Sequence, residues 1–383
     1  MNIYDQAIKK HREWKGKLTT TLKMPLENKN DLSLAYTPGV AAPCLEIQKD
    51  ETNVYQYTSK GNLVAVITDG SAVLGLGDIG PAASLPVMEG KAALFKRFAD
   101  IDAVSIALDT KDTEKIIETI AMIAPSFGGI NLEDISAPRC VEIERALVER
   151  LDIPVFHDDQ HGTAIVVTAA VINALKLVEK PKESLKVIVS GTGAAGSAVI
   201  KMLYQFGIKN ILAYNKKGLL MRNKLNEYDK LQKEIAMITN PNNVTATFEE
   251  AFDQADMFIG VSVKDLVTKA MIKKMNDKPI IFALANPDPE ITYQDALDAG
   301  AYIVGTGRSD HPNQINNVLA FPGLFRGALD VRATKITEAM KLAAAYAIAD
   351  CVNAKDLSTT KIMPSVFDHT ISTNVAEAVK KAV

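Results

Sequence analysis

The sequence predicts an α/β protein of two domains, each with a mostly parallel sheet flanked by helices. Short apolar runs alternate with longer amphipathic ones from about residue 60 to about residue 330, and strands that alternate with helices form parallel sheets covered on both faces. The chain has 383 residues, more than the size at which a single hydrophobic core stops growing, so two domains are expected.

Short apolar runs rich in β-branched residues are the expected strands. They are LVAVIT (63–68), DAVSIAL (102–108), FGGIN (127–131), IPVFH (153–157), LKVIVS (185–190), ILAY (211–214), DMFIGV (256–261) and IIFALA (280–285). Helical patterns between them include residues 113–124, with Asp112 placed to cap the helix, and residues 140–151. Residues 163–177 are apolar on every face, which predicts a buried helix.

Composition argues against several classes of function. The net charge of -3 is spread along the chain without long runs of one sign, so neither nucleic acid nor a polybasic membrane contact is expected. Cys44, Cys140 and Cys351 lie far apart, which fits a reducing cytoplasm. Charges from Asp5 onward speak against a signal peptide, and the apolar stretch 162–175 is shorter than the ~20 residues that span a bilayer.

Two segments match the pattern G-x-G-x-x-G. The first, residues 75–80, lies several residues past its strand and continues into Pro81 and Pro86, so no helix is expected to open directly from it. The second follows the strand at 185–190 and opens a helical pattern, which is the context that places a pyrophosphate at a helix N-terminus. The predicted dinucleotide loop of a Rossmann-type domain is therefore Gly191, Thr192, Gly193, Ala194, Ala195 and Gly196.

The residue expected to bind the adenosine ribose is Asn215, at the end of the next strand. No acid occurs between Gly191 and Asn226. Asparagine can hydrogen-bond a ribose hydroxyl but does not repel a 2′-phosphate. Lys216 and Lys217 could attract such a phosphate or be solvated loop lysines, so the choice between NAD and NADP stays open.

Two pairs of acids follow strands. Glu133 and Asp134 come after the run FGGIN, and Asp158 and Asp159 come after IPVFH. Adjacent residues in an extended segment point in opposite directions, so each pair can serve two roles. Oxygen ligands favour Mg²⁺ or Mn²⁺, and helix capping is the alternative for each pair alone. His157 and His161 lack a second His or Cys at zinc-ligand spacing.

These segments resemble the malic enzyme family, in its short bacterial-type form, over nearly the whole chain and in the family's order. The motifs that carry the resemblance are LSLAYTPGVAAPC (32–44), TDGSAVLGLGDIGP (68–81), PVMEGKAALFK (86–96), NLEDI (131–135), FHDDQHGTA (156–164), GTGAAG (191–196), ANPDPE (285–290) and NNVLAFPG (316–323). The resemblance implies oxidative decarboxylation of L-malate to pyruvate and CO₂, with NAD or NADP and with Mg²⁺ or Mn²⁺. It also implies a cytoplasmic homodimer and decarboxylation of oxaloacetate as a side activity.

The resemblance also implies roles for individual residues. Glu133, Asp134 and Asp159 would bind the metal, and Lys91 and Tyr36 would be the catalytic acid and base, with Asp158 supporting Lys91. The residues expected to contact substrate or cofactor are Lys91, Thr163, Asn286 and Asn317. Residues 1–160 would form the substrate and metal domain, and residues 161–383 the Rossmann-type domain with C-terminal helices.

A lysine can take a proton near neutral pH only if burial or a neighbouring cation lowers its pKa, and Asp158 by itself would raise it. Larger members of the family carry an arginine shortly after TDG, where this chain has residues 71–73 (SAV). The group that binds the second malate carboxylate is therefore open. Two other functions remain as alternatives: a metal-dependent oxaloacetate decarboxylase, and a catalytically silent metabolite-binding protein.

Overall fold

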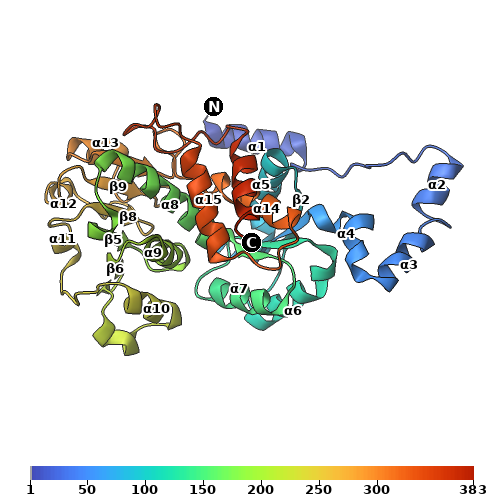
Figure 1. Cartoon of the computed structure of the whole chain (residues 1–383), viewed down its shortest axis with the longest axis horizontal. Helices are drawn as coiled ribbons and strands as arrows, with labels where there is room; N and C mark the ends of the chain where they lie inside the picture. The colour runs from blue at the N-terminus through green and yellow to red at the C-terminus, as the bar shows by residue number, and fades with distance from the viewer. Residues whose placement is uncertain (1) are drawn as a thin grey trace.

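The computed structural model describes residues 2–383 and contains two sheets, each in its own lobe (Figure 1). The four-stranded sheet has the order β2-β1-β3-β4 and is parallel throughout. Its strands are β1 (Leu63–Thr68), β2 (Asp102–Ala107), β3 (Gly129–Leu132) and β4 (Val155–His157). The six-stranded sheet has the order β10-β9-β8-β5-β6-β7, in which β7 pairs antiparallel and the other pairs are parallel. Its strands are β5 (Lys186–Ser190), β6 (Asn210–Asn215), β7 (Gly218–Leu219), β8 (Met257–Gly260), β9 (Ile280–Ala283) and β10 (Ile303–Thr306).

Helices flank both sheets, and within residues 2–383 four α-helices precede the first strand. These four are α1 (Ile3–Trp14), α2 (Lys29–Ala35), α3 (Ala41–Lys49) and α4 (Val54–Tyr57). The helices of the first lobe are α5 (Pro81–Ala99), α6 (Thr113–Ile123) and α7 (Arg139–Arg150). The long helix α8 (Asp158–Val178) precedes those of the second lobe, which are α9 (Ala194–Phe206), α10 (Lys230–Ile238), α11 (Phe248–Ala251), α12 (Lys269–Ile272) and α13 (Tyr293–Asp298). The chain ends with α14 (Phe321–Asp330), α15 (Glu338–Asp350) and α16 (Ile371–Lys380).

The predicted fold class is confirmed, and the expected strands are present within a few residues of their predicted ends. The side chain of Asp112 caps α6 as expected, by accepting a hydrogen bond from the amide of Lys115. The strands β7 and β10 are additions to the predicted set. The division of the chain at residue 160 stays a prediction.

One local expectation is wrong, because a helix does open directly after residues 75–80. Helix α5 begins at Pro81 and continues through Pro86. Proline is tolerated at the first helical position because its missing amide would have no intrahelical partner there. Pro86 leaves one hydrogen bond of the helix unmade, and the rest of the nineteen-residue helix compensates by burying Met88, Ala92 and Phe95.

Helix α8 runs through the core, as the sequence predicts for an apolar helix. Among residues 2–383 it is the one helix that is long and apolar enough to cross a membrane by length and composition, and most of its apolar window is buried inside the protein. It packs against α9 on one side and α15 on another. Its start at Asp158 is five residues earlier than the apolar pattern suggested.

Aromatic rings join the C-terminal helices to the first lobe. Phe95 of α5 packs edge-on against Phe321 and Phe325 of α14, with ring centroids 4.8 Å and 5.3 Å apart. Phe325 also meets Phe156 of β4 at 5.8 Å. Figure 1 shows α14 beside α5, although more than two hundred residues separate them in the sequence. The C-terminal segment, defined here as residues 317–383, therefore joins the two lobes through a shared core.

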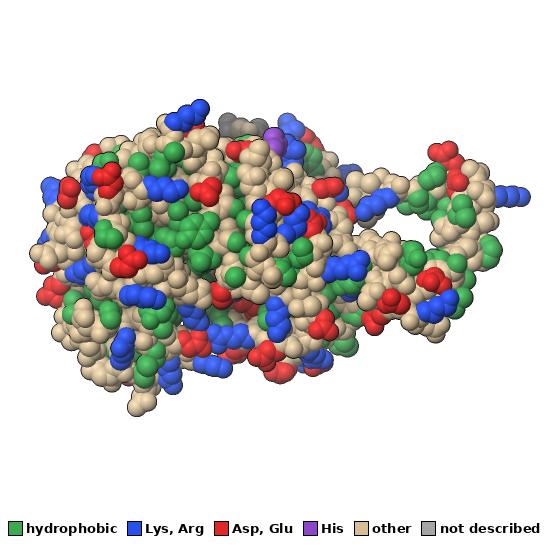
Figure 2. All heavy atoms as spheres, viewed as in Figure 1, with side chains coloured by type: hydrophobic (Ala, Val, Ile, Leu, Met, Phe, Trp, Pro, Cys, Tyr) green, Lys and Arg blue, Asp and Glu red, His purple; other side chains and the backbone are tan. Residues whose placement is uncertain are grey.

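The N-terminal arm, defined here as residues 18–49, projects from the first lobe and carries α2 and α3 (Figure 1). Neither helix has a buried residue. Figure 2 shows hydrophobic side chains exposed along the arm. The large exposed apolar residues of the arm are Leu18, Leu22, Met24, Leu26, Leu32, Leu34, Tyr36, Val40 and Leu45.

We predict that Phe325→Ala lowers the free energy of unfolding by about 3–5 kcal/mol, because it removes a fully buried ring and leaves a cavity. Chemical denaturation of the purified protein measures the change. The matched control is Phe367→Ala, since Phe367 is 72% exposed and its removal leaves no cavity. Equal destabilisation by the two variants would contradict the shared aromatic core.

Candidate active site

Two pairs of acids lie at one edge of the four-stranded sheet. Glu133 and Asp134 follow β3, and Asp158 and Asp159 follow β4. Because β3 and β4 are parallel neighbours, their carboxyl ends lie side by side, and this edge of a parallel sheet is where ligands bind in such folds.

Lys91 of α5 reaches into these acids and is buried, with 7% of its surface exposed. Its Nζ lies 2.9 Å from Oε1 of Glu133 and donates a hydrogen bond to Oδ2 of Asp158. The ring of Phe321 packs against the ammonium group, with its centroid 4.2 Å from Nζ. Burial alone would lower the pKa of Lys91, but Asp158 and Glu133 outweigh burial and hold the pKa above its usual range. Without a further cation nearby, Lys91 therefore keeps its proton at neutral pH.

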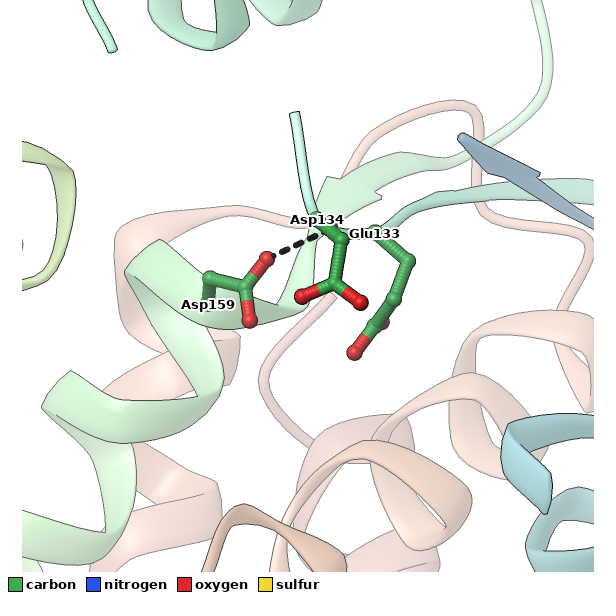
Figure 3. Close-up of side chains that lie close together, drawn as sticks. All are labelled: Glu133, Asp134 and Asp159. Atoms are coloured by element: carbon green, nitrogen blue, oxygen red, sulfur yellow. Dashed lines mark hydrogen bonds between the residues drawn. The ribbon is translucent and has the colours of Figure 1, made fainter. Parts of the chain in front are cut away.

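The side chains of Glu133, Asp134 and Asp159 turn toward a common space (Figure 3). Each offers one oxygen, and these oxygens lie within 4.8 Å of one another. The amide of Asp134 donates to Oδ2 of Asp159 over 2.8 Å. Burial, together with the nearby carboxylates, raises the pKa of Asp134 to about 8 and that of Asp159 to about 6. Asp134 and Asp159 are therefore poorly stabilised as anions unless positive charge is added.

The donor set of this cluster fits a divalent metal ion. Oδ2 of Asp134 is buried and, within residues 2–383, has no hydrogen-bond partner. A buried carboxylate oxygen without a partner is costly unless it binds a cation. Oxygen ligands suit Mg²⁺ or Mn²⁺. His157 and His161 are not members of the cluster.

Asp158 has different partners from its neighbour Asp159. It is fully buried, and its Oδ2 accepts hydrogen bonds from Lys91 and from Nδ2 of Asn317. Burial raises its pKa to about 7 despite the opposing charge of Lys91. Gly162 leaves room for this carboxylate, because a Cβ atom at that position would lie 2.0 Å from Oδ1 of Asp158.

The side chains of Asp158 and Asp159 point to different partners for a different reason than the sequence suggested. Asp158 and Asp159 lie in the first turn of α8 and not in an extended segment. Successive side chains on a helix point about 100° apart, which still directs the two carboxylates to different neighbours. The alternative, capping of their own helix, is not observed among the described residues. Asp158 accepts from Lys91 and Asn317, and Asp159 accepts from the amide of Asp134.

A cavity of about 380 Å³ opens between the sheets beside the acids. Its lining includes several predicted site residues: Asp159, Thr163, Ala195, Asn286 and Asn317. Leu74 and Ser262 also line it. Sequence reasoning missed these two because no local pattern marks a loop residue that only the fold brings to a cavity.

The predicted dinucleotide loop follows β5 and opens α9, as its context suggested. A cavity of about 320 Å³ is lined by Gly191, Thr192, Gly193 and Asn215. Lys216 and Asp229 line the same cavity, and Oδ1 of Asn215 accepts a hydrogen bond from the amide of Lys217 over 2.7 Å. Gly196 allows close packing of helix and strand, because a Cβ there would lie 1.9 Å from the carbonyl oxygen of Gly191. The loop residues Ala194 and Gly196 belong to the first turn of α9.

Tyr36 is the predicted site residue that the structure does not bring to the others. It follows α2 on the N-terminal arm and is 67% exposed. Lys91, in contrast, is buried in the first lobe. Within one chain, the predicted acid and base therefore do not share a site.

The six-stranded sheet presents its glycine loop at the carboxyl edge, and the neighbouring cavity is lined by Ala195 of this loop and by the carboxylate of Asp159 at the start of α8. This combination of fold and site is that of a nicotinamide-dependent oxidoreductase.

Comparison with protein families identifies the family of oxidoreductases to which this chain belongs. Residues 15–148 match the family model "Malic enzyme, N-terminal domain", and residues 160–383 match "Malic enzyme, NAD binding domain". The chain belongs to the malic enzyme family, and the resemblance found in the sequence is confirmed.

Individual relatives cover the chain from end to end. A "Bifunctional malic/malolactic enzyme" of Bacillus subtilis (strain 168) is 53% identical over 382 residues, covering 100% of this chain and 93% of the relative. An "NADP-dependent malic enzyme" of Escherichia coli (strain K12) is 48% identical over 384 residues, covering 96% of this chain and 50% of the relative. The crystal structure of an NAD-dependent malic enzyme from Thermotoga maritima matches with a TM-score of 0.95 and 51% identity, covering 98% of this chain and 99% of that one.

We predict that the carboxylate cluster makes the metal-free protein less stable as the pH rises. The raised pKa values of Asp134 and Asp159 mean that the folded state binds more protons than the unfolded state between about pH 4 and pH 8. In chelator, Asp134→Asn should therefore raise the free energy of unfolding by roughly 1–3 kcal/mol at pH 8 and by much less at pH 4. Urea denaturation at the two pH values measures this.

The control for this prediction is Asp356→Asn, at an exposed position outside the cluster. It should leave the pH dependence of unfolding unchanged. Two results together would contradict the repulsion argued for the cluster. In chelator, the free energy of unfolding of the wild type would rise between pH 4 and pH 8, and Asp134→Asn would not raise it at pH 8.

Proposed function

We propose that this chain catalyses the oxidative decarboxylation of L-malate to pyruvate and CO₂ with NAD or NADP. The observation that carries the proposal is the cavity of about 380 Å³, which Asp159 of the carboxylate cluster and Ala195 of the dinucleotide loop both line. A substrate held there can contact the cluster and the cofactor at once. Such positioning of reacting groups supplies a large part of enzymatic rate enhancement.

The proposed metal ligands are Glu133, Asp134 and Asp159. A divalent cation held by them would polarise the C2 oxygen of malate and would offset the carboxylates that raise the pKa of Lys91. The preferred metal, Mg²⁺ or Mn²⁺, is open.

The proton steps are assigned to Lys91 and Tyr36. Nζ of Lys91, neutral once a cation offsets the neighbouring acids, would take the proton of the C2 hydroxyl as the hydride passes from C2 to the oxidised nicotinamide. Asp158 keeps Nζ oriented through its hydrogen bond. The bond between C3 and C4 then breaks and CO₂ leaves. The hydroxyl of Tyr36 supplies the proton that C3 receives. Asn286 and Asn317, which line the cavity, would orient the substrate and the nicotinamide.

The loop at residues 191–196 and Thr163 would hold the cofactor, with Asn215 at the ribose. Asn215 carries no charge that would exclude a 2′-phosphate, and Asp229 and Lys216 line the same cavity with opposite charges. Preference for NAD or NADP therefore stays open. Decarboxylation of added oxaloacetate is proposed as a side activity, and the free cysteines suit a cytoplasmic location.

The test is malate-dependent formation of NADH or NADPH by the purified protein with Mn²⁺. Lys91→Met should lower kcat by about 10²–10⁴-fold, because it removes a general acid–base group. A protein that decarboxylates oxaloacetate but reduces neither nucleotide would be a decarboxylase. Absence of turnover with both nucleotides would favour a metabolite-binding protein.

We also propose that the enzyme is a homodimer in which the arm of each subunit delivers Tyr36 to the other subunit's cavity. Large exposed apolar surfaces usually mark protein contacts, and the arm is apolar over much of its length without burying a residue of α2 or α3. A proton donor on this arm has to reach the cavity beside the acids that Lys91 contacts. Reciprocal exchange of identical arms is the self-complementary contact of a two-fold dimer.

Mixing two inactive variants tests the exchange. Tyr36→Phe and Lys91→Met should each be nearly inactive alone. After subunit exchange, half of the dimers are mixed and one of their two sites is intact, so about a quarter of wild-type activity should return. Absence of recovery in a mixture shown to contain mixed dimers would mean that Tyr36 acts within its own subunit.

A further inference from the structure

The acids in the first turn of α8 do not cap the amides at the start of this helix. The first amides of a helix have no intrahelical partner, and an acid at the start of the helix commonly accepts from them. Here the two acids of the first turn are engaged elsewhere: Asp158 with Lys91, and Asp159 with the amide of Asp134. His157, which precedes the helix, makes no side-chain cap either.

Glu144 of α7 contacts the start of α8 from outside the helix, through the amide of His157 and the side chains of Gln160 and His161. It is buried, with 7% of its surface exposed. Its Oε1 accepts a hydrogen bond from the amide of His157 over 3.0 Å. Its Oε2 lies 3.3 Å from Nε2 of Gln160 and 2.9 Å from Nε2 of His161. One carboxylate thus contacts residues on both sides of Asp158 and Asp159.

Lys341 fixes the direction of these hydrogen bonds. Its Nζ lies 3.2 Å from Nδ1 of His161 and also donates to Glu338. An ammonium group can only donate, so Nδ1 of His161 accepts and the ring proton lies on Nε2. His161 therefore donates to Glu144. Every partner of Glu144 is a donor, and only a carboxylate can accept from all of them.

We propose that Glu144 is a positioning residue, which holds the first turn of α8 so that Asp158 faces Lys91 and Asp159 faces the other two metal ligands. His157 and Gln160 bracket the two acids, and both are tied to Glu144. Lys341, on α15 of the C-terminal segment, extends this support through His161. The inference rests on the metal site of the proposed function.

The test is Glu144→Gln in the full-length protein, measured by Mn²⁺ binding with electron paramagnetic resonance. Glutamine keeps the length of the side chain, but its amide nitrogen would face a donor. Loss of a residue that orients metal ligands typically weakens metal binding by about 10–100-fold. We expect that loss, together with a fall in kcat for malate, while NADH binding by fluorescence stays as in wild type. The control is Glu149→Gln, exposed on the same helix, which should change none of these.

A second variant, Lys341→Met, keeps an apolar stem and frees Nδ1 of His161, so Mn²⁺ binding should weaken by about 3–10-fold. If Glu144→Gln does not fold, the Lys341→Met variant tests whether this network positions the metal ligands. If Glu144→Gln folds and binds Mn²⁺ as tightly as wild type, this inference alone is overturned. If Glu144→Gln does not fold, a wild-type affinity of Lys341→Met for Mn²⁺ overturns it in the same way. A wild-type protein that binds NADH but no Mn²⁺ overturns the proposed metal site and this inference together.

Discussion

The rest of the site depends on four carboxylates gathered around one ammonium group at the edge of the first sheet. Three of the carboxylates are buried, and that of Asp159 is partly exposed. Lys91 contacts Glu133 and Asp158, but burial still raises the pKa of Asp134, Asp158 and Asp159. Buried charges of one sign persist only if the surrounding structure holds them and a counter-charge is available. This imbalance is the physical reason to expect a divalent cation among these acids.

Parts of the chain that are far apart in sequence hold these acids and Lys91 in place. The first lobe provides the strands and Lys91, and α8 carries two of the acids. Asn317 and Phe321, from the C-terminal segment, contact Asp158 and Lys91. The same segment packs its aromatic rings on the first lobe. The stability of the shared core and the geometry of the site are therefore coupled, because the residues that join the lobes also contact the catalytic candidates.

The N-terminal arm carries a predicted catalytic residue away from the body of its own chain (Figure 1). The sequence motif around Tyr36 indicated a catalytic residue, and its neighbours form an ordinary short helix. Nothing in local sequence predicts that the arm projects from the body, and neither α2 nor α3 buries a residue. The exposed apolar surface of the arm is the observation on which the proposed dimer rests.

The sequence by itself determined the alternation of strands and helices, the glycine loop after β5, and the two acid pairs at strand ends. These are local patterns, in which side-chain periodicity and turn chemistry act over a few residues. Only the tertiary structure decided that Asp158 faces Lys91 while Asp159 faces Glu133 and Asp134. It also separated Tyr36 from them and revealed Glu144 behind the start of α8. Such contacts join residues far apart in sequence, and their geometry follows from how helices pack on the sheets, which no local pattern contains.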